Sequence, residues 1–546
     1  MTTLLILVIP LVIFLVSIRH RRTPNQPPRL SETIPFISNV WQFMTDKNRF
    51  IARVSMALRT SPVVQCQLGP LKSHFVAGSE HVPTLFKSAM FTSEPWVIHI
   101  IKHTAGYIPV DVAKFVRDGS GSSRQPRVTG SAKDAIPESE RIWYALHQTY
   151  NAALSGPQSV KTICTAYQTF FEQQLSTILA SKGGGSELLL FDFLKKSMSR
   201  AAFCATFGPG IIDMNPGFME AFWKYEGLAE PLTFGLPSWL NRGGIEARNT
   251  VRDMCTKWYE RADHEFAWER LEADQDTIWE PVFGSPLSRG LARWGKAFDF
   301  STEGMGPVYA LFLLALNTNT VPICTWIMME LIKDPDLLQA VKREVARSTI
   351  LGAGASSPQT LDEQKITSIP LLQSIYAEAL RLHVGILITR TSLVPVTVAG
   401  YRFPTGTVFY APTQVAHLDE STWGVPGHPA SEFWAYRHTQ ERVTENEKGE
   451  VEKHLEYSLA GPPGAFFPYG GGTAMCAGRN FAKAEVLLTV AVLVSRLPDI
   501  TFWEWLKPDG SPSDRPARDD TWYSNSGAAP PDREMRVRWE DLAGDV

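Results

Sequence analysis

The chain has 546 residues, of which 44% are hydrophobic and 16 are tryptophans, so it can bury a large core. Its formal net charge is -3, from 53 basic and 56 acidic residues, and no basic stripe stands out, which argues against nucleic acid as a partner. The six cysteines are scattered, without a C-x-x-C pair, and this favours a reducing, cytosolic environment over a secreted disulfide scaffold.

An apolar run occupies residues 4–18, and the basic cluster at residues 19–22 follows it. A cleavable signal peptide, the alternative interpretation, carries charges before its apolar run and small residues after it, and this segment has neither. With its uncharged flank the run reaches about 18 residues, the short end of a bilayer span. Because basic flanks stay in the cytosol, residues 1–22 are predicted to be a membrane anchor with a cytosolic body behind it.

Four prolines punctuate residues 23–40, which predicts a stiff, extended hinge. Beyond it, residues 41–57 have a helical pattern, and residues 63–77 are typical of a β-hairpin around a Gly-Pro turn. No long linker divides the remaining chain, so residues 41–546 are predicted to form one large domain.

Trp143 and His147 stand four residues apart in a helical segment and therefore share one face. A packed tryptophan near an exposed helix end is an equally simple interpretation of this pair.

A long apolar helix is predicted after Pro307, ending at Asp334, and it contains the polar run Asn317-Thr318-Asn319-Thr320. Pro322 lacks an N–H group, so it leaves the Thr318 carbonyl without its helical donor and should kink the axis. The kink and the polar groups predict a place for water or a small ligand. Hydrogen bonds from these side chains to their own backbone are the alternative.

A second helix is predicted over residues 369–382, where Glu378 and Arg381 share a face. The flanks are apolar, so the pair should be buried, and a buried pair requires a further hydrogen-bonding partner. Strands are expected at residues 394–399 and 408–411, and residues 515–539 are expected to close the fold as a hairpin.

The glycine-rich loop at residues 466–481 contains Tyr469, three consecutive glycines ending at Gly472, and then Cys476. Glycines let such a backbone approach a flat ligand closely. A helix is predicted to begin near Gly478, and the N–H groups at its start favour a thiolate over a thiol. The cysteine is therefore a candidate nucleophile or metal ligand.

The spacing of Tyr469, Gly472, Cys476 and Gly478 resembles the haem-binding loop of cytochromes P450. This resemblance implies the mostly helical P450 fold with a smaller β region, preceded by a single N-terminal transmembrane helix. It also implies haem b as cofactor, with the Cys476 sulfur as the axial iron ligand. One position departs from the family pattern, because Ala474 stands where a basic residue is usual.

Further motifs follow in the family's order. Members of the family show a Glu-x-x-Arg pair joined by a downstream arginine, and Arg437 matches that arginine, which implies a structural lock behind the haem. By the same resemblance Arg390 is expected to contact a haem propionate and to replace the missing base at Ala474. His147, in the helical segment that also contains Trp143, is expected to bind a haem propionate.

On the long helix, Thr318 and Asn319 stand where P450s usually place an acid and a threonine. The Asn-Thr-x-Pro sequence is similar to the branch that contains cholesterol 7-alpha-hydroxylase, sterol 12-alpha-hydroxylase and prostacyclin synthase, and so holds both monooxygenases and an isomerase. Thr318, Asn319 and Thr320 are candidates for orienting water near the iron.

The resemblance implies a monooxygenase in the endoplasmic reticulum membrane that takes electrons from NADPH through NADPH-cytochrome P450 reductase. An apolar lining expected from Phe312, Leu316, Ile386 and Leu387 predicts a lipophilic substrate, such as a terpenoid, a steroid-like molecule or a related fungal secondary metabolite. A haem-thiolate isomerase or dehydratase that needs no reductase is the second hypothesis. A third, Cys476 as a covalent nucleophile, has no activating histidine signature in its favour.

Overall fold

The computed structural model describes residues 25–127, 136–182, 186–270, 277–350, 361–445, 451–497 and 499–539. The predicted anchor, residues 1–22, lies outside these ranges. The described chain is mostly helical with a smaller strand part, as the sequence predicts.

Helices fill most of the chain. Those before residue 270 are α2 (Ser38–Thr45), α3 (Lys47–Leu58), α4 (His81–Lys87), α5 (Glu94–His103), α6 (Pro109–Arg117), α7 (Ile142–Ser155), α8 (Pro157–Lys182), α9 (Leu190–Phe207), α10 (Gly210–Asp213), α11 (Phe218–Gly227), α12 (Ala229–Thr233) and α13 (Arg242–Glu265). Those after it are α14 (Pro286–Ala297), α15 (Thr302–Asn317), α16 (Thr320–Lys333), α17 (Pro335–Ile350), α18 (Glu363–Ser368), α19 (Pro370–His383), α20 (Thr413–His417), α21 (Glu420–Trp423) and α22 (Arg479–Arg496).

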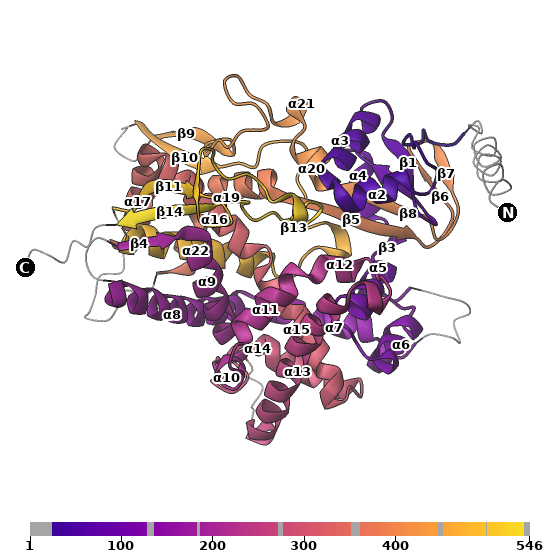
Figure 1. Ribbon diagram of the computed structural model, residues 1–546, viewed down its shortest axis with the longest axis horizontal. Helices are drawn as coiled ribbons and strands as arrows, with labels where there is room; N and C mark the ends of the chain where they lie inside the picture. Colours follow the sequence, from indigo (N-terminus) through magenta and orange to yellow (C-terminus); the bar gives the residue numbers. More distant parts are fainter. Residues whose placement is uncertain are drawn as a thin grey trace, which may run out of the picture.

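Two larger sheets lie toward opposite sides of the view in Figure 1, with α16, α19 and α22 between them. The first has the order β1-β2-β8-β5-β13, with β3 also on β5, and is built from β1 (Val63–Leu68), β2 (Leu71–Val76), β3 (Phe91–Thr92), β5 (Val384–Ser392), β8 (Val408–Pro412) and β13 (Ser526–Ala528). The second has the order β12-β11-β14-β4 and is built from β4 (Ser186–Leu189), β11 (Thr501–Leu506), β12 (Pro512–Ser513) and β14 (Glu534–Trp539). Two separate pairs are formed by β6 (Val396–Val398) with β7 (Tyr401–Phe403), and by β9 (Thr439–Glu445) with β10 (Val451–Tyr457).

The strands confirm one hairpin prediction fully and another only in part. β1 and β2 pair antiparallel from Val63 opposite Val76 to Leu68 opposite Leu71, as expected. The closing hairpin is confirmed only around an antiparallel bridge between Asp519 and Pro531. The named strands of this segment pair elsewhere, β13 with β5 and β14 with β11 and β4. Pro530 and Pro531 lie between β13 and β14, and prolines have no N–H group with which to continue a ladder.

The segment after the predicted anchor is fastened to the first sheet. The N–H of Leu30 donates to the carbonyl of Gln65 at 2.8 Å, and the N–H of Gln65 donates to the carbonyl of Pro28 at 2.8 Å. The helix expected over residues 41–57 is two helices, since the Asp46 side chain accepts from the N–H of Arg49 and caps α3. Helix α2 begins within the segment 23–40 that was expected to be a hinge.

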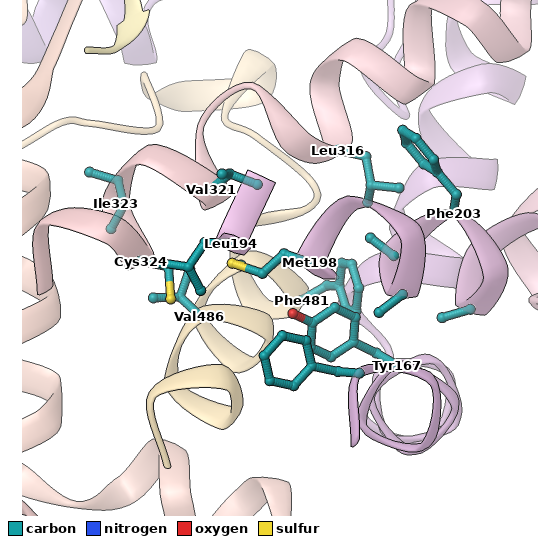
Figure 2. Close-up of a cluster of buried hydrophobic side chains, with 14 of the residues drawn as sticks. Tyr167, Leu194, Met198, Phe203, Leu316, Val321, Ile323, Cys324, Phe481 and Val486 are labelled. Atoms are coloured by element: carbon teal, nitrogen blue, oxygen red, sulfur yellow. The ribbon is translucent and has the colours of Figure 1, made fainter. Parts of the chain in front are cut away.

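Helix α22 runs through the main hydrophobic core. Figure 2 shows side chains of α8, α9, α15, α16 and α22 that meet there, among them Tyr167, Met198, Leu316, Cys324 and Val486. The burial of α22 matters for the site, because this helix begins three residues after Cys476.

The same core contains two residues of the predicted pocket lining. Leu316 packs in this cluster, and the ring of Phe312 stacks on Tyr150 with centroids 5.9 Å apart. Both side chains are mostly buried, and their place in a pocket lining stays a prediction.

Within the described ranges, one apolar stretch is long enough to cross a membrane, residues 302–333, which form α15 and α16. The most apolar 18 residues of this stretch are 78% buried inside the protein, so the stretch is a core element of the fold.

Candidate active site

The cysteine loop depends on two glycines with left-handed backbone angles, Gly470 at φ 71° and Gly472 at φ 67°. A Cβ atom added to Gly472 would stand 1.8 Å from the carbonyl oxygen of Phe86 on α4. The loop then turns so that the N–H of Cys476 donates to the carbonyl of Tyr469 at 3.0 Å. Only glycine fits at position 472, and this close approach to α4 fixes where the cysteine lies.

Cys476 is the exposed cysteine of the chain, whereas the other five are buried. Its thiol is accessible but has protein atoms on most sides, and this burial raises its pKa, while the N–H groups of Gly478 and Arg479 and the Arg479 charge act in the opposite direction. The start of the helix alone therefore does not secure the thiolate. A metal cation would do so, because a coordinating thiol loses its proton.

Tyr469 holds the loop at two points. Its carbonyl accepts from Cys476, and its hydroxyl forms a hydrogen bond with the hydroxyl of Tyr376 on α19. Burial raises the pKa of both phenols, so the pair is neutral. The sequence does not predict the contact between Tyr376 and Tyr469, because the two tyrosines are 93 residues apart and no local pattern links them.

Arg390 on β5 is buried and lies beside the same loop. Its guanidinium donates to the carbonyls of Gly471 at 2.8 Å and Thr389 at 2.9 Å, and stands 5.2 Å from the centre of the Phe86 ring. Burial lowers its pKa to about 10, and no carboxylate in the described part of the chain pairs with it. A buried cation without a carboxylate partner fits an anionic ligand group such as a propionate.

His147 lies on α7, the helix that reaches the cysteine loop at its end. There the Ser155 hydroxyl donates to the carbonyl of Ala477 at 3.4 Å, and Leu154 is next to Gly478. His147 is seven residues before Leu154 and so faces the same side of α7. It is half-buried, and burial lowers its pKa, which leaves it a neutral donor.

Trp143, on the same face of α7, uses its side chain in contacts with Phe115. Its indole N–H donates to the carbonyl of Phe115 at 3.0 Å, and the two rings pack edge to face. Of the pair singled out in the sequence, His147 alone keeps its side chain for a ligand.

The long helix is interrupted where Pro322 predicts a kink. α15 ends at Asn317 and α16 begins at Thr320, with Thr318 and Asn319 between them. The Thr318 hydroxyl donates to the carbonyl of Leu314 at 2.6 Å, and the Thr320 hydroxyl donates to that of Leu316 at 3.0 Å. Both threonines therefore use their hydroxyl hydrogens within the helix, the alternative left open by the sequence.

Asn319 differs from its neighbours because it is exposed in a segment that is otherwise mostly buried. Ala315, four residues earlier on the same face, is exposed as well, and no local sequence signal marks it. The Asn319 carbonyl oxygen accepts from the N–H of Ala528 at 2.8 Å. Of the three candidates for orienting water, Asn319 is the one with an accessible amide.

The predicted lock is confirmed. Glu378 and Arg381 are fully buried, with 2.8 Å between Oε1 and Nη2, and Arg437 Nε lies 2.8 Å from the same Oε1. His438, which the sequence interpretation missed, places Nε2 3.4 Å from Glu378 Oε2. Burial alone would raise the pKa of Glu378, but hydrogen bonds led by that of Arg381 outweigh it and lower the pKa to about 2.

The contacts join some of the predicted site residues more closely than others. Tyr469, Gly472, Cys476 and Arg390 meet around one loop. The end of α7, eight residues after His147, contacts the same loop. Asn319 is on a different element, connected to this loop through the packing of α16 on α22. One accessible thiol, a buried guanidinium without a carboxylate partner and a neutral imidazole together fit a haem.

Comparison with known proteins agrees with this donor set. A family model described as Cytochrome P450 matches residues 113–498. The chain is 37% identical over 519 residues to "Cytochrome P450 monooxygenase calL" of Penicillium decumbens, covering 95% of this chain and 93% of that protein. It is 27% identical over 512 residues to "Cytochrome P450 monooxygenase fsoE" of Humicola fuscoatra, covering 88% and 84%. It is 26% identical over 505 residues to "Cytochrome P450 monooxygenase efuG" of Hormonema carpetanum, covering 88% and 85%.

Proposed function

The chain belongs to the cytochrome P450 family, and on that basis we propose that it oxidises a lipophilic small molecule, with electrons that reach it from NADPH through NADPH-cytochrome P450 reductase. The family brings haem b with a cysteine thiolate ligand and an oxygen-incorporating oxidoreductase activity. The observation that carries the proposal is the accessible Cys476 thiol beside the buried, unneutralised guanidinium of Arg390.

Haem bound through a thiolate supplies the activation of dioxygen, and the protein supplies binding and orientation. In this proposal Cys476 is the iron ligand, and Tyr469 and Gly472 keep its loop in place. Arg390 and His147 hold the propionates. Asn319 keeps a water molecule at the break between the two helices, with its oxygen fixed by Ala528 and its amide nitrogen available to that water.

The proposal of a lipophilic substrate rests on the small and apolar groups near this break. Ala315 is exposed on the same face as Asn319, and Ile386 on β5 is partly exposed and packs against the main core. Leu387, the next residue of the strand, faces the other side and packs against the cluster around Phe50. Apolar walls with a few polar groups are typical of sites for such ligands. Within that class we favour terpenoids, steroid-like molecules or related secondary metabolites of fungi.

We place the protein at the endoplasmic reticulum membrane as a single-pass protein with a cytosolic catalytic domain. Residues 1–22 would form the anchor, residues 23–40 the connection and residues 41–546 the catalytic domain. Ile37 and Trp41, 58% and 68% exposed, lie on α2 and its flank and would face the bilayer.

The experiment is a carbon monoxide difference spectrum of the full-length protein in membranes with the reductase, recorded after reduction by NADPH and separately by dithionite. A thiolate-type band with both reductants is expected. Absence of the band in folded protein would refute the assignment of Cys476, and the matched control is Cys66→Ser, a buried cysteine whose loss should leave the band intact.

A haem-thiolate isomerase or dehydratase is the second candidate. It is favoured by one observation, that the hydroxyl hydrogens of Thr318 and Thr320 are held by backbone carbonyls and are not directed at a ligand. This candidate predicts the thiolate band with dithionite but product formation without NADPH or reductase, so substrate turnover in their absence distinguishes the two.

A further inference from the structure

Glu485 is a buried acid that the proposed function leaves without a role. It lies on α22, nine residues after Cys476, and its side chain is 0% exposed. Neither of its carboxyl oxygens has a hydrogen-bond partner of good geometry among the described residues. The hydroxyl of Thr320, the first residue of α16, lies within its reach.

The hydroxyl of Thr320 has only one hydrogen, and that hydrogen is donated to the carbonyl of Leu316 at 3.0 Å. A hydroxyl oxygen also has two lone pairs that accept hydrogen bonds. An ionised Glu485 can only accept, so it would face an oxygen with no hydrogen to give. A protonated Glu485 can donate to that oxygen, and the contact then satisfies both groups.

The surroundings of Glu485 keep it neutral. Its charge would act on four titratable side chains from the packed helices, whose pKa values burial raises: Cys164 and Tyr167 on α8, Cys324 on α16 and Tyr376 on α19. No lysine or arginine of the described chain pairs with it. Burial without a cation raises the pKa of Glu485 well above its ordinary value.

We propose that Glu485 is a positioning residue, whose protonated carboxyl donates to the Thr320 hydroxyl and so holds the break between α15 and α16 against the helix that follows the cysteine ligand. The link joins α16, which follows Asn319, to α22, which follows Cys476. Because Asn319 directly precedes Thr320, fixing Thr320 fixes the backbone from which the exposed amide of Asn319 projects. The effect on catalysis rests on the proposed function, whereas the hydrogen bond itself does not.

The test uses the ferric holoenzyme without substrate or reductase, so it does not depend on the reaction catalysed. Hydrogen exchange is followed in peptides that cover residues 314–323, and imidazole is titrated as a probe ligand of the iron. Glu485→Gln keeps a neutral donor and is expected to stay within twofold of the parent in both measurements. Glu485→Leu and Thr320→Val remove the donor and the acceptor, and each should raise exchange several-fold and change the imidazole dissociation constant at least threefold.

Coupling between the two sites separates this link from a general packing defect. The double variant Glu485→Leu/Thr320→Val should be no worse than the poorer single variant, because both remove one contact. Thr325→Val is the matched control, since its buried hydroxyl donates to the carbonyl of Val321 at 2.8 Å on the same helix. Its effect should add to that of Glu485→Leu.

Infrared difference spectra between the parent and Glu485→Gln should show the loss of a protonated carboxyl band at neutral pH. Loss of a carboxylate band would overturn the proposal, as would additive effects of Glu485→Leu and Thr320→Val or unchanged exchange in Thr320→Val. If Glu485→Leu does not fold, the exchange of Thr320→Val and the infrared spectrum still decide the matter.

Discussion

The side-chain carbonyl of Asn319 accepts a hydrogen bond of 2.8 Å from the backbone N–H of Ala528. These two residues are 209 positions apart, and the bond ties the break in the long helix to β13 at the edge of the first sheet. A Cβ atom at Gly527 would stand 2.6 Å from the same oxygen, so the backbone has to pass close by. The orientation of the Asn319 amide is therefore set by β13.

Asn319→Ala removes both the accessible amide and the acceptor for Ala528. We expect more peroxide released per NADPH consumed, because water near the iron loses its partner. The free energy of unfolding should fall by about 1–3 kcal/mol, the cost of a buried N–H without an acceptor. Peroxide and NADPH are measured in the reconstituted enzyme, and unfolding by denaturant titration.

Asn319→Asp is the matched variant, since its carboxylate keeps an acceptor for Ala528 while losing the amide. It should retain stability and still release more peroxide. If Asn319→Ala leaves the ratio of peroxide to NADPH unchanged, Asn319 has no part in handling water.

Gly472→Ala should prevent haem binding. The new Cβ would overlap the Phe86 carbonyl and the residue would keep a positive φ, so the loop that presents Cys476 has to move. Gly510→Ala is the control, because Gly510 also has a positive φ, 81°, but has nothing within 4 Å. It should lose about 1–2 kcal/mol from backbone strain alone and keep its haem. Haem content per protein is the measurement, and equal content in the two variants would contradict this account.

The buried lock makes stability dependent on pH on the acid side. The pKa of Glu378 is lowered from 4.5 to about 2 in the folded protein, so the carboxylate stabilises the fold above about pH 4.5. That contribution, about 3 kcal/mol from the size of the shift, is lost as the pH falls from about 4.5 to about 2.

Glu378→Gln should remove this dependence, and it should also destabilise the protein at pH 7 by about 3–5 kcal/mol, because two buried arginines lose their carboxylate. Unfolding measured from pH 7 to pH 3 tests both effects. A parallel decline with pH in parent and variant would assign the acid sensitivity to other groups.

Arg390→Leu should have opposite effects on the two forms of the protein. Without haem, the variant should unfold at a higher temperature than the parent, because an unneutralised buried cation has been removed. With haem, transfer to apomyoglobin should be about 10–100 times faster, the equivalent of a lost charge-assisted hydrogen bond.

Arg390→Lys should recover part of the retention, and Arg402→Leu, at an exposed arginine on β7, serves as the control. Equal rates of haem transfer in Arg390→Leu and Arg402→Leu would exclude Arg390 as a propionate partner.

Local pattern was sufficient for several features. The glycine loop with its helix, the β1–β2 hairpin and the break near Pro322 all follow from residues within a few positions of one another. The lock can be predicted because a buried ion pair, such as Glu378 with Arg381, needs a third hydrogen-bonding partner. In each case the chemistry of a short segment leaves few alternatives.

Contacts between residues that are far apart in the chain could not be predicted from the sequence. Nothing near Asn319 indicates Ala528, and nothing near Arg390 indicates Gly471, 81 residues away. The apolar pattern of the long helix does not indicate that Ala315 is exposed beside Asn319. An evenly apolar helix contains no periodic signal, so only its packed neighbours decide which side stays open.

The final strands have a consequence for synthesis of the protein. β13 completes one sheet and β14 lies between β11 and β4 in the other, so both sheets need residues 526–539, which are synthesised after all the α-helices that the structure describes. Until then β4 and β5 each lack a neighbour, and unpaired strand edges invite association with other chains. A nascent chain stalled before residue 526 would hold a nearly complete helical body with two open edges, and would be a natural client for chaperones.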